Sequence, residues 1–481
     1  MIAAGKWEPV IGLEVHVHLA TRTKMFCGCE LSFGDPPNTR TCPVCLALPG
    51  SLPVTNERAI HFGLMVGLAL GCDIAPRSIF HRKNYFYPDN PKGYQISQYD
   101  EPLCLGGRLG DVRVHRVHLE EDAAKTIHVS ASGRIHGSDR SVVDFNRAGT
   151  PLVEIVTEPE LHSPEQSREW LGLLRTTLRQ LGVSDVKMEE GSLRVDANVS
   201  VRPAGASELG VKTELKNMNS FAFLERGLRA EIARQVGLLE AGEPVVQETV
   251  HFDPATDELT SLRSKEEAHD YRYFPEPDLV PVAISESMLA GARDAMPELP
   301  VARAERFSAD LGVNEANARA LAFRADLADF FEAALGATEA NGGGFAQALA
   351  KWVTGEVVGR VGDADPAQTP LEPAALAALV EMVESKSVTV GAARQVLDRL
   401  VAEGGDPAAI VESEGLGALD DGDELAAVVA AAIAAEPEAA ERVRGGNDKA
   451  VGPIVGHVMR ETTGRADGGD VNRLIREQLG L

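Results

Sequence analysis

Residues 10–19 read VIGLEVHVHL, and from Leu13 onward apolar and polar side chains alternate. This alternation, with β-branched valine at the apolar positions, predicts a strand with one buried face. Glu14, His16 and His18 then share the other face, because side chains two residues apart in a strand point the same way. A carboxylate and an imidazole on one face can bind a cation or pass a proton. For this stretch alone, a solvated strand face with incidental histidines is an equal alternative.

The same pattern recurs in residues 116–122, 150–158 and 192–202. Carboxylates in apolar strands are costly to bury unless they are paired, metal-bound or turned to water. Hydration is the ordinary alternative for each segment. The polar faces are nevertheless rich in acidic, histidine and arginine side chains, which favours an open sheet that cradles a charged ligand. The polar positions are His118, Glu120 and Asp122, then Glu154 and Glu158, then Arg194, Asp196, Asn198, Ser200 and Arg202. Lys212 to Asn217 partly repeats the pattern.

Four of the six cysteines form two close pairs, Cys27 with Cys29 and Cys42 with Cys45. Two short chelating pairs joined by a turn-rich loop are typical of a tetrahedral structural zinc site. Free thiols are the alternative. The N-terminus lacks a secretory signal, so disulfides are not expected.

Composition limits the class of protein. The formal net charge of -25 at pH 7 argues against a basic coat over the whole surface, although a local cationic patch is compatible with it. No apolar run is long enough to span a membrane. We therefore expect a soluble cytoplasmic protein without a membrane partner.

The chain is long enough for several domains. We expect an α+β fold: an antiparallel sheet cradle with helices and a zinc knot over residues 1–285, an all-helical domain over 286–404, and a helical tail over 405–481. Periodic apolar residues predict helices at 57–70, 163–181, 220–239, 314–335, 345–358, 373–384 and 390–402. Residues 404–422 read as a linker or a loose short helix.

Two segments combine cations with aromatic rings, residues 81–95 and 269–278. The first has a composition that suits phosphate contact and stacking on a base. An aromatic mini-core under a loop is the alternative. The tail is locally basic, so it could contact a phosphate backbone, although a plain solvated helical surface explains the same residues. The basic residues of the tail are Arg442, Arg444, Lys449, Arg460, Arg465, Arg473 and Arg476.

Taken together, these motifs resemble the GatB family, which contributes one subunit to tRNA-dependent amidotransferases. The resemblance covers essentially the whole chain. It rests on residues 10–16, the paired cysteines, 81–95, 118–122, 144–151, the strand from Ser192, 214–221 and 449–451.

The resemblance implies an enzyme of the ligase class that phosphorylates the side-chain carboxylate of Glu-tRNA(Gln) or Asp-tRNA(Asn) with ATP and then amidates it with ammonia. It implies Mg2+ on His16, Glu120 and Glu154, with Glu14 as a further catalytic residue and Glu121 beside them. Zn2+ would be bound by the four paired cysteines. Lys83, Arg194, Asp196 and Lys216 are candidates for ATP or substrate contact.

The resemblance also implies partners. Ammonia would come from a glutaminase subunit, GatA, with a small GatC subunit, because no amidase constellation is visible in this chain. The helical domain and tail would engage misacylated tRNA. Two other functions remain open on the residues alone: a non-catalytic, zinc-stabilised RNA-binding scaffold, and a metal-dependent RNA hydrolase that needs no ATP.

Overall fold

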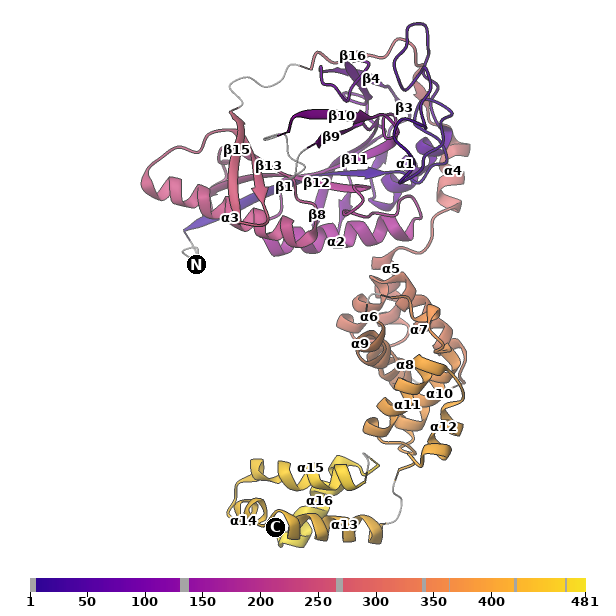
Figure 1. Cartoon of the computed structure of the whole chain (residues 1–481), viewed down its shortest axis with the longest axis vertical. Coiled ribbons are helices and arrows are strands. Elements are labelled where there is room, and N and C mark those ends of the chain that lie inside the picture. The colour runs from indigo at the N-terminus through magenta and orange to yellow at the C-terminus, as the bar shows by residue number, and fades with distance from the viewer. Residues whose placement is uncertain are drawn as a thin grey trace. The chain divides into compact units, whose positions relative to one another are not determined.

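The computed structural model describes residues 6–129, 138–264, 271–339, 343–362, 364–418, 422–462 and 465–481. The chain divides into two compact units, residues 1–299 and 300–481, and each is described by itself. Sheets dominate the first unit and helices make up the second (Figure 1). The predicted α+β class is confirmed. The division into three domains remains a prediction.

Within the described residues, the first unit is built on a ten-stranded sheet with the order β15-β14-β13-β12-β1-β11-β8-β6-β2, and β7 pairs with β8. Neighbouring strands are antiparallel except β13 and β14, which are parallel. The alternating residues 10–18 lie in the central strand β1, between β12 and β11. The strands are β1 (Trp7–His18), β2 (Asp73–Ile74), β6 (Cys104–Leu105), β7 (Arg108–Leu109), β8 (Val112–Glu121), β11 (Pro151–Thr157), β12 (Leu193–Pro203), β13 (Thr213–Lys216), β14 (Glu248–Asp253) and β15 (Glu258–Ser264).

Alternation along β1 separates the two faces of the sheet as predicted. Leu13, Val15 and Val17 are buried, whereas His16 and His18 on the other face are partly exposed. Helices α2 (Pro164–Gln180) and α3 (Phe221–Ala241) lie along one side of the sheet (Figure 1). Two packed helices exclude water from the apolar face, so the opposite face is left to carry the polar side chains.

A small sheet lies over the polar face. It consists of β4 (His81–Asn84), β5 (Tyr94–Ser97) and β16 (Phe274–Pro275). Arg82 holds it together, because its guanidinium donates to both carboxylate oxygens of Glu276, at 2.7 and 2.8 Å. Residues 81–95 are therefore a hairpin with an irregular tip. Two further ladders pair β9 (Lys125–Val129) with β10 (Arg140–Asp144), and β3 (Arg77–Ser78) with β17 (Val282–Ala283).

The predicted helices at 57–70, 163–181, 220–239, 373–384 and 390–402 are confirmed, with ends shifted by one or two residues. The prediction of one helix over 314–335 is wrong. It breaks between α6 and α7 at Arg324, whose backbone is extended and whose guanidinium donates to the Gly362 carbonyl at 2.7 Å. That side-chain bond satisfies a second segment and starts a new helix, which periodicity alone does not reveal.

The helical unit contains two hydrophobic cores, one from Phe307 to Leu416 and one from Leu425 to Leu479. The predicted linker at 404–422 contains α12, a helix that packs Val411 into the first core. Among the described residues, no helix is long and apolar enough to cross a membrane. The remaining helices are α1 (Glu57–Ala69), α4 (Glu286–Asp294), α5 (Pro300–Ala309), α6 (Glu315–Ala322), α7 (Ala325–Gly336), α8 (Gly343–Lys351), a π-helical turn (Trp352–Val357), α9 (Val358–Val361), a 3-10 turn (Pro366–Gln368), α10 (Pro373–Glu384), α11 (Val390–Glu403), α12 (Pro407–Glu414), α13 (Gly422–Ala435), α14 (Pro437–Arg444), a 3-10 turn (Asp448–Val451), α15 (Gly452–Glu461) and α16 (Gly468–Leu479).

Candidate active site

Four polar side chains occupy one row across neighbouring strands of the large sheet. His16 on β1 pairs with Arg194 on β12 and with Glu154 on β11. Glu154 pairs in turn with His118 on β8. Directly paired residues of antiparallel strands share a face, so strand register alone brings these groups together. Glu120 lies two residues beyond His118 and points to the same face.

The two imidazoles bracket the Glu154 carboxylate. His16 Nε2 lies 3.2 Å from Glu154 Oε2, and His118 Nε2 lies 3.4 Å from the same oxygen. The two oxygens of Glu120 lie 3.9 Å from His16 Nε2 and 3.8 Å from His118 Nε2. Glu120 is 3% exposed and Glu154 is 4% exposed. Charges this deeply buried must be balanced by cationic or hydrogen-bonding neighbours.

The charge states follow from this arrangement. Burial alone would lower the pKa of both histidines, but the carboxylates outweigh it: the pKa of His16 is raised, and that of His118 is raised to about 9. Burial alone would raise the pKa of Glu154, yet the two imidazoles hold it well below its usual range. Glu14 differs, because burial and the neighbouring Glu154 charge both raise its pKa. The row is thus a compact set of alternating charges.

The set fits a divalent cation. One ligand atom from each of His16, Glu120 and Glu154 lies within 4.8 Å of the others, and Glu14, His16 and Asp196 form a second such group. Carboxylate oxygens suit Mg2+, which prefers hard ligands, whereas the imidazole is the unusual member of the set. The donors therefore match the predicted metal residues, although their assignment to Mg2+ remains a proposal.

Sequence reasoning assigns no role to three residues that support these carboxylates. Ser97 on β5 donates its hydroxyl to Glu120 Oε2 at 3.0 Å, and Arg116 Nη2 lies 3.7 Å from Glu154 Oε1. His118, the third, is recognisable from the alternation only as a face residue of its strand. Ser97 comes from the small sheet, and no local pattern indicates its contact with Glu120.

Of the predicted ligand-contact residues, Lys83 lies closest to the buried carboxylates in its effect. Burial alone would lower its pKa, but the negative charges of Glu120 and Glu154 raise it above the ordinary value. Its Nζ lies 5.0 Å from the centre of the Tyr271 ring. Lys216 is engaged elsewhere, donating to Asp196 at 2.8 Å and lying 3.0 Å from Glu214.

Arg194 belongs to a separate ionic group centred on Asp122. Asp122 Oδ2 accepts from Arg194 Nη2 at 2.8 Å and lies 2.7 Å from His18 Nε2. Arg147 Nε lies 3.4 Å from the same oxygen. Burial opposes ionisation here, but these cations lower the pKa of Asp122. His18 and Asp122 thus share the polar face but do not join the Glu154 cluster.

Glu158 also lies away from the cluster. The register shifts between Val156 and Thr157, and the Glu158 carboxylate lies 2.9 Å from His115 Nδ1. A shift of one residue turns following side chains to the other face, so simple alternation fails beyond it.

The four paired cysteines converge between β1 and α1. Their sulfurs all lie within 4.8 Å of one another. Lys24 is fully buried beside them, and its Nζ donates to the carbonyls of Arg40 at 2.8 Å and Phe145 at 3.1 Å. Four sulfurs at this spacing can hold a metal, and the donor set is the one that structural zinc sites use. We call this segment, residues 27–45, the cysteine knot.

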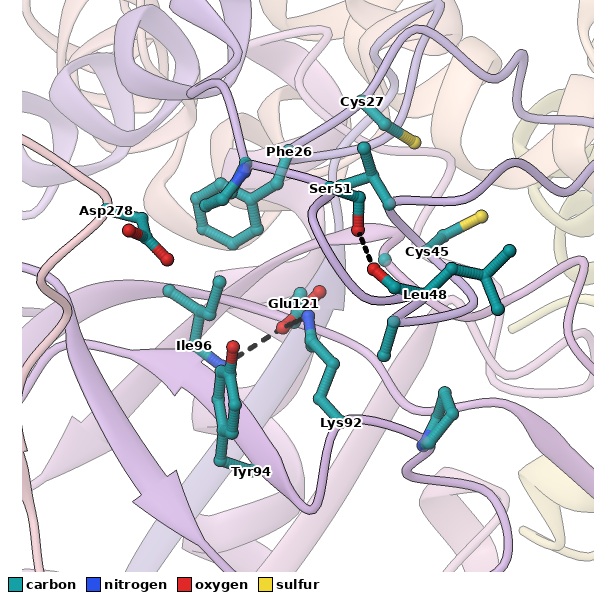
Figure 2. A pocket seen from close by; sticks show the side chains of 15 residues that line it. Phe26, Cys27, Cys45, Leu48, Ser51, Lys92, Tyr94, Ile96, Glu121 and Asp278 are labelled. Carbon is teal, nitrogen blue, oxygen red and sulfur yellow. Dashed lines mark hydrogen bonds and ion pairs between the residues drawn. The ribbon is translucent and has the colours of Figure 1, made fainter.

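A cavity of about 180 Å³ lies between the cysteine knot and the β4–β5 hairpin. Figure 2 shows Lys92 pointing toward Glu121, with Tyr94 and Ile96 beside them and Phe26 across the cavity. Lys92 pairs with the Glu121 carboxylate, which also accepts from the Ile96 amide at 3.0 Å. Glu121 therefore lines this cavity, whereas Glu120, its neighbour on β8, belongs to the cluster on the polar face.

Comparison with known protein families matches two models to this chain. The GatB/GatE catalytic domain matches residues 9–290, which include every member of the carboxylate cluster, and the GatB domain matches residues 329–479. The chain belongs to the GatB family. The first match contains both the sheet and the cysteine knot, so the family's catalytic domain coincides with the site described above.

Individual relatives agree over nearly the full length. A protein of Anaeromyxobacter dehalogenans is 50% identical over 98% of this chain and 99% of its own length. Proteins of Frankia casuarinae, 49% identical, and Geobacter sulfurreducens, 46% identical, cover 99% and 98% of this chain and 96% and 99% of their own lengths. All three are named as GatB-type subunits of an aspartyl/glutamyl-tRNA(Asn/Gln) amidotransferase. This GatB-family chain is therefore an enzyme subunit of the amidotransferase class, with partner subunits implied.

Proposed function

We propose that this GatB-family chain uses ATP to activate the side-chain carboxylate of Glu-tRNA(Gln) or Asp-tRNA(Asn) for amidation. A carboxylate oxygen attacks the γ-phosphorus of ATP, ADP leaves, and an acyl phosphate forms on the substrate. Ammonia then attacks the acyl carbon and phosphate departs, leaving the amide. The observation that carries the proposal is the pair of buried carboxylates, Glu120 and Glu154, bracketed by two imidazoles on the open face of the sheet.

Each group has a part in positioning the phosphoryl transfer. We propose that His16, Glu120 and Glu154 hold Mg2+, which when bound neutralises the transferring phosphate. Glu14 borders this position, 3.6 Å from His16 Nε2. Lys83 contributes a positive charge beside the carboxylates, and Arg194, Asp196 and Lys216 are proposed as contacts for ATP or substrate. Phosphoryl transfer depends mainly on positioning and charge, which is what such a set of fixed charges can provide.

The ammonia must come from another subunit. Cysteine nucleophiles react as thiolates, and the two cysteines outside the knot are buried. Burial raises the pKa of the Cys72 thiol to about 12 and that of Cys104 well above its usual value. We therefore propose a glutaminase partner, GatA, together with GatC, in an assembly that works in the cytoplasm.

We propose that the helical unit contacts the tRNA, and that the four cysteines of the knot bind Zn2+ as a structural site. The exposed basic side chains around the last core of the helical unit suit a phosphate backbone. They are Arg442, Arg444, Lys449, Arg460, Arg473 and Arg476.

ATP consumption by the assembled enzyme distinguishes this function from the two alternatives. We expect hydrolysis that requires misacylated tRNA and falls by about 100-fold or more in Glu120→Gln, because a neutral amide cannot balance the cation and imidazoles. Binding of tRNA should stay within about twofold, since Glu120 is buried. The control is Glu101→Gln, which alters an exposed carboxylate paired with Arg77.

Unchanged ATP consumption in Glu120→Gln would overturn the assignment and favour a scaffold. Cleavage of the tRNA chain without ATP would favour an RNA hydrolase instead.

A further inference from the structure

Two tyrosines stack on each other at the edge of the active site. The rings of Tyr99 and Tyr273 have centroids 4.2 Å apart and planes inclined by 9°. Tyr271 meets Tyr273 edge-on at 6.1 Å, and His81 meets Tyr99 edge-on at 6.4 Å. We call these four rings the tyrosine platform. It is assembled from two segments that lie far apart in the sequence.

The tyrosine platform adjoins the carboxylate cluster. Ser97, whose hydroxyl binds Glu120, pairs with His81 across the β4–β5 hairpin. Tyr99 follows Ser97 by two residues, about 7 Å along an extended chain. The pKa of the Tyr273 hydroxyl is raised, first by burial and then by the charges of Glu120 and Glu154, against the opposing charge of Lys83. The rings therefore lie within electrostatic range of the reacting groups.

The tyrosine platform is held in place by backbone contacts. The backbone amide of Asn84 on β4 donates to the Tyr271 carbonyl at 2.9 Å, and the Asn84 side-chain amide donates to the Arg272 carbonyl at 2.8 Å. Strand β16 then continues the same pairing against β4. A platform fixed in this way loses little conformational freedom when a flat ligand stacks on it.

Tyr99 remains 50% exposed although one side of its ring is stacked on Tyr273. An aromatic mini-core would bury this ring, so burial alone does not explain the pair. Beside it, the exposed Asp100 carboxylate is fixed 2.9 Å from His81 Nε2 and offers a hydrogen-bond acceptor. An exposed aromatic face with an acceptor at its rim is suited to a nucleobase that carries an amino group.

We propose that the free face of Tyr99 binds an adenine base, with Tyr273 supporting the ring from behind. This inference rests on the proposed function, because both nucleotides of that reaction carry adenine: ATP itself, and the 3′-terminal adenosine that carries the amino acid on tRNA. The structure specifies the shared chemistry, and the experiment separates the two sources.

The test measures stacking directly in the full assembly. Two fluorescent probes replace adenine with 2-aminopurine, whose emission is quenched by stacking: 2-aminopurine riboside triphosphate, and a short RNA ending in CC-2-aminopurine. In Tyr99→Leu we expect the affinity of one probe to fall on the order of 10-fold or more and its quenching to disappear. Tyr99→Phe should retain both, because it keeps the ring. Tyr87→Leu removes an exposed tyrosine at the tip of the same hairpin and serves as the control.

Loss of the triphosphate signal alone would assign the base to ATP, and loss of the RNA signal alone would assign it to the tRNA terminus. Unchanged affinity and quenching for both probes in a folded Tyr99→Leu assembly would overturn the proposal. The measurement requires no turnover, so it separates from carboxylate activation: in Glu120→Gln, ATP consumption should be lost while the probe of the platform is still quenched.

Discussion

Replacing Glu154 by glutamine is expected to lower the kcat of tRNA amidation by about 10³-fold, equivalent to about 4 kcal/mol of transition-state stabilisation. Glu154 is the centre of the row, because both imidazoles contact its Oε2 and Arg116 approaches its Oε1. Glutamine has nearly the same shape but carries no charge, so it weakens cation binding and leaves two histidines facing a neutral group. Single-turnover formation of amidated tRNA at saturating ATP measures the effect.

The matched control for this substitution is Glu158→Gln. It changes the same residue type four positions along the chain, where the carboxylate pairs with His115 outside the cluster. We expect its amidation rate to stay within about twofold of the native rate, as for most surface substitutions. Equal losses in both variants would mean that position in the cluster has no special role. Near-native turnover in Glu154→Gln would remove Glu154 from the metal site.

Replacing Cys45 by serine is expected to abolish stoichiometric zinc binding and to destabilise the first unit by at least about 3 kcal/mol, because structural zinc contributes directly to folding energy. The cysteine knot is joined to the segment before β11: the Asn38 side chain accepts from the Phe145 amide at 2.7 Å, and Asn146 accepts from the Arg40 amide at 2.8 Å. Loss of the metal should therefore loosen the start of the strand that carries Glu154. Metal content and urea unfolding of the purified chain measure both effects.

Cys72→Ser is the control, because Cys72 is buried away from the knot and lines no metal cluster among the described residues. It should retain native zinc content and lose at most about 1–2 kcal/mol for burying a hydroxyl. If Cys45→Ser retained both zinc and stability, the four sulfurs would not form the predicted site.

Alternation along the chain is sufficient to predict β1 and β12 and the faces of their side chains. It succeeds there because each strand has one apolar face packed under helices, so register is fixed by burial. Register then carries the prediction into three dimensions, since His16, Glu154 and Arg194 meet only because β11, β1 and β12 are neighbours. The cysteine spacing likewise predicts the convergence of four sulfurs that the structure shows.

Other parts of the site depend on contacts between distant segments. Ser97 reaches Glu120 because the β4–β5 hairpin folds over the sheet, which no local pattern encodes. Alternation groups Glu158 with Glu154, but the register shift after Val156 separates them. Asp122 follows the alternation correctly, yet its partners are His18 and Arg194. In each case the choice of partner is a tertiary property.

The decisive measurement follows oxygen-18 from the substrate into phosphate. Glu-tRNA(Gln) or Asp-tRNA(Asn) labelled with oxygen-18 in the side-chain carboxylate is amidated by the native assembly, and the released phosphate is analysed by mass spectrometry. Activation by phosphorylation predicts one labelled oxygen in each phosphate, because the carboxylate oxygen that attacks ATP leaves with the phosphoryl group. Unlabelled phosphate formed alongside amidated tRNA would contradict carboxylate phosphorylation by this site.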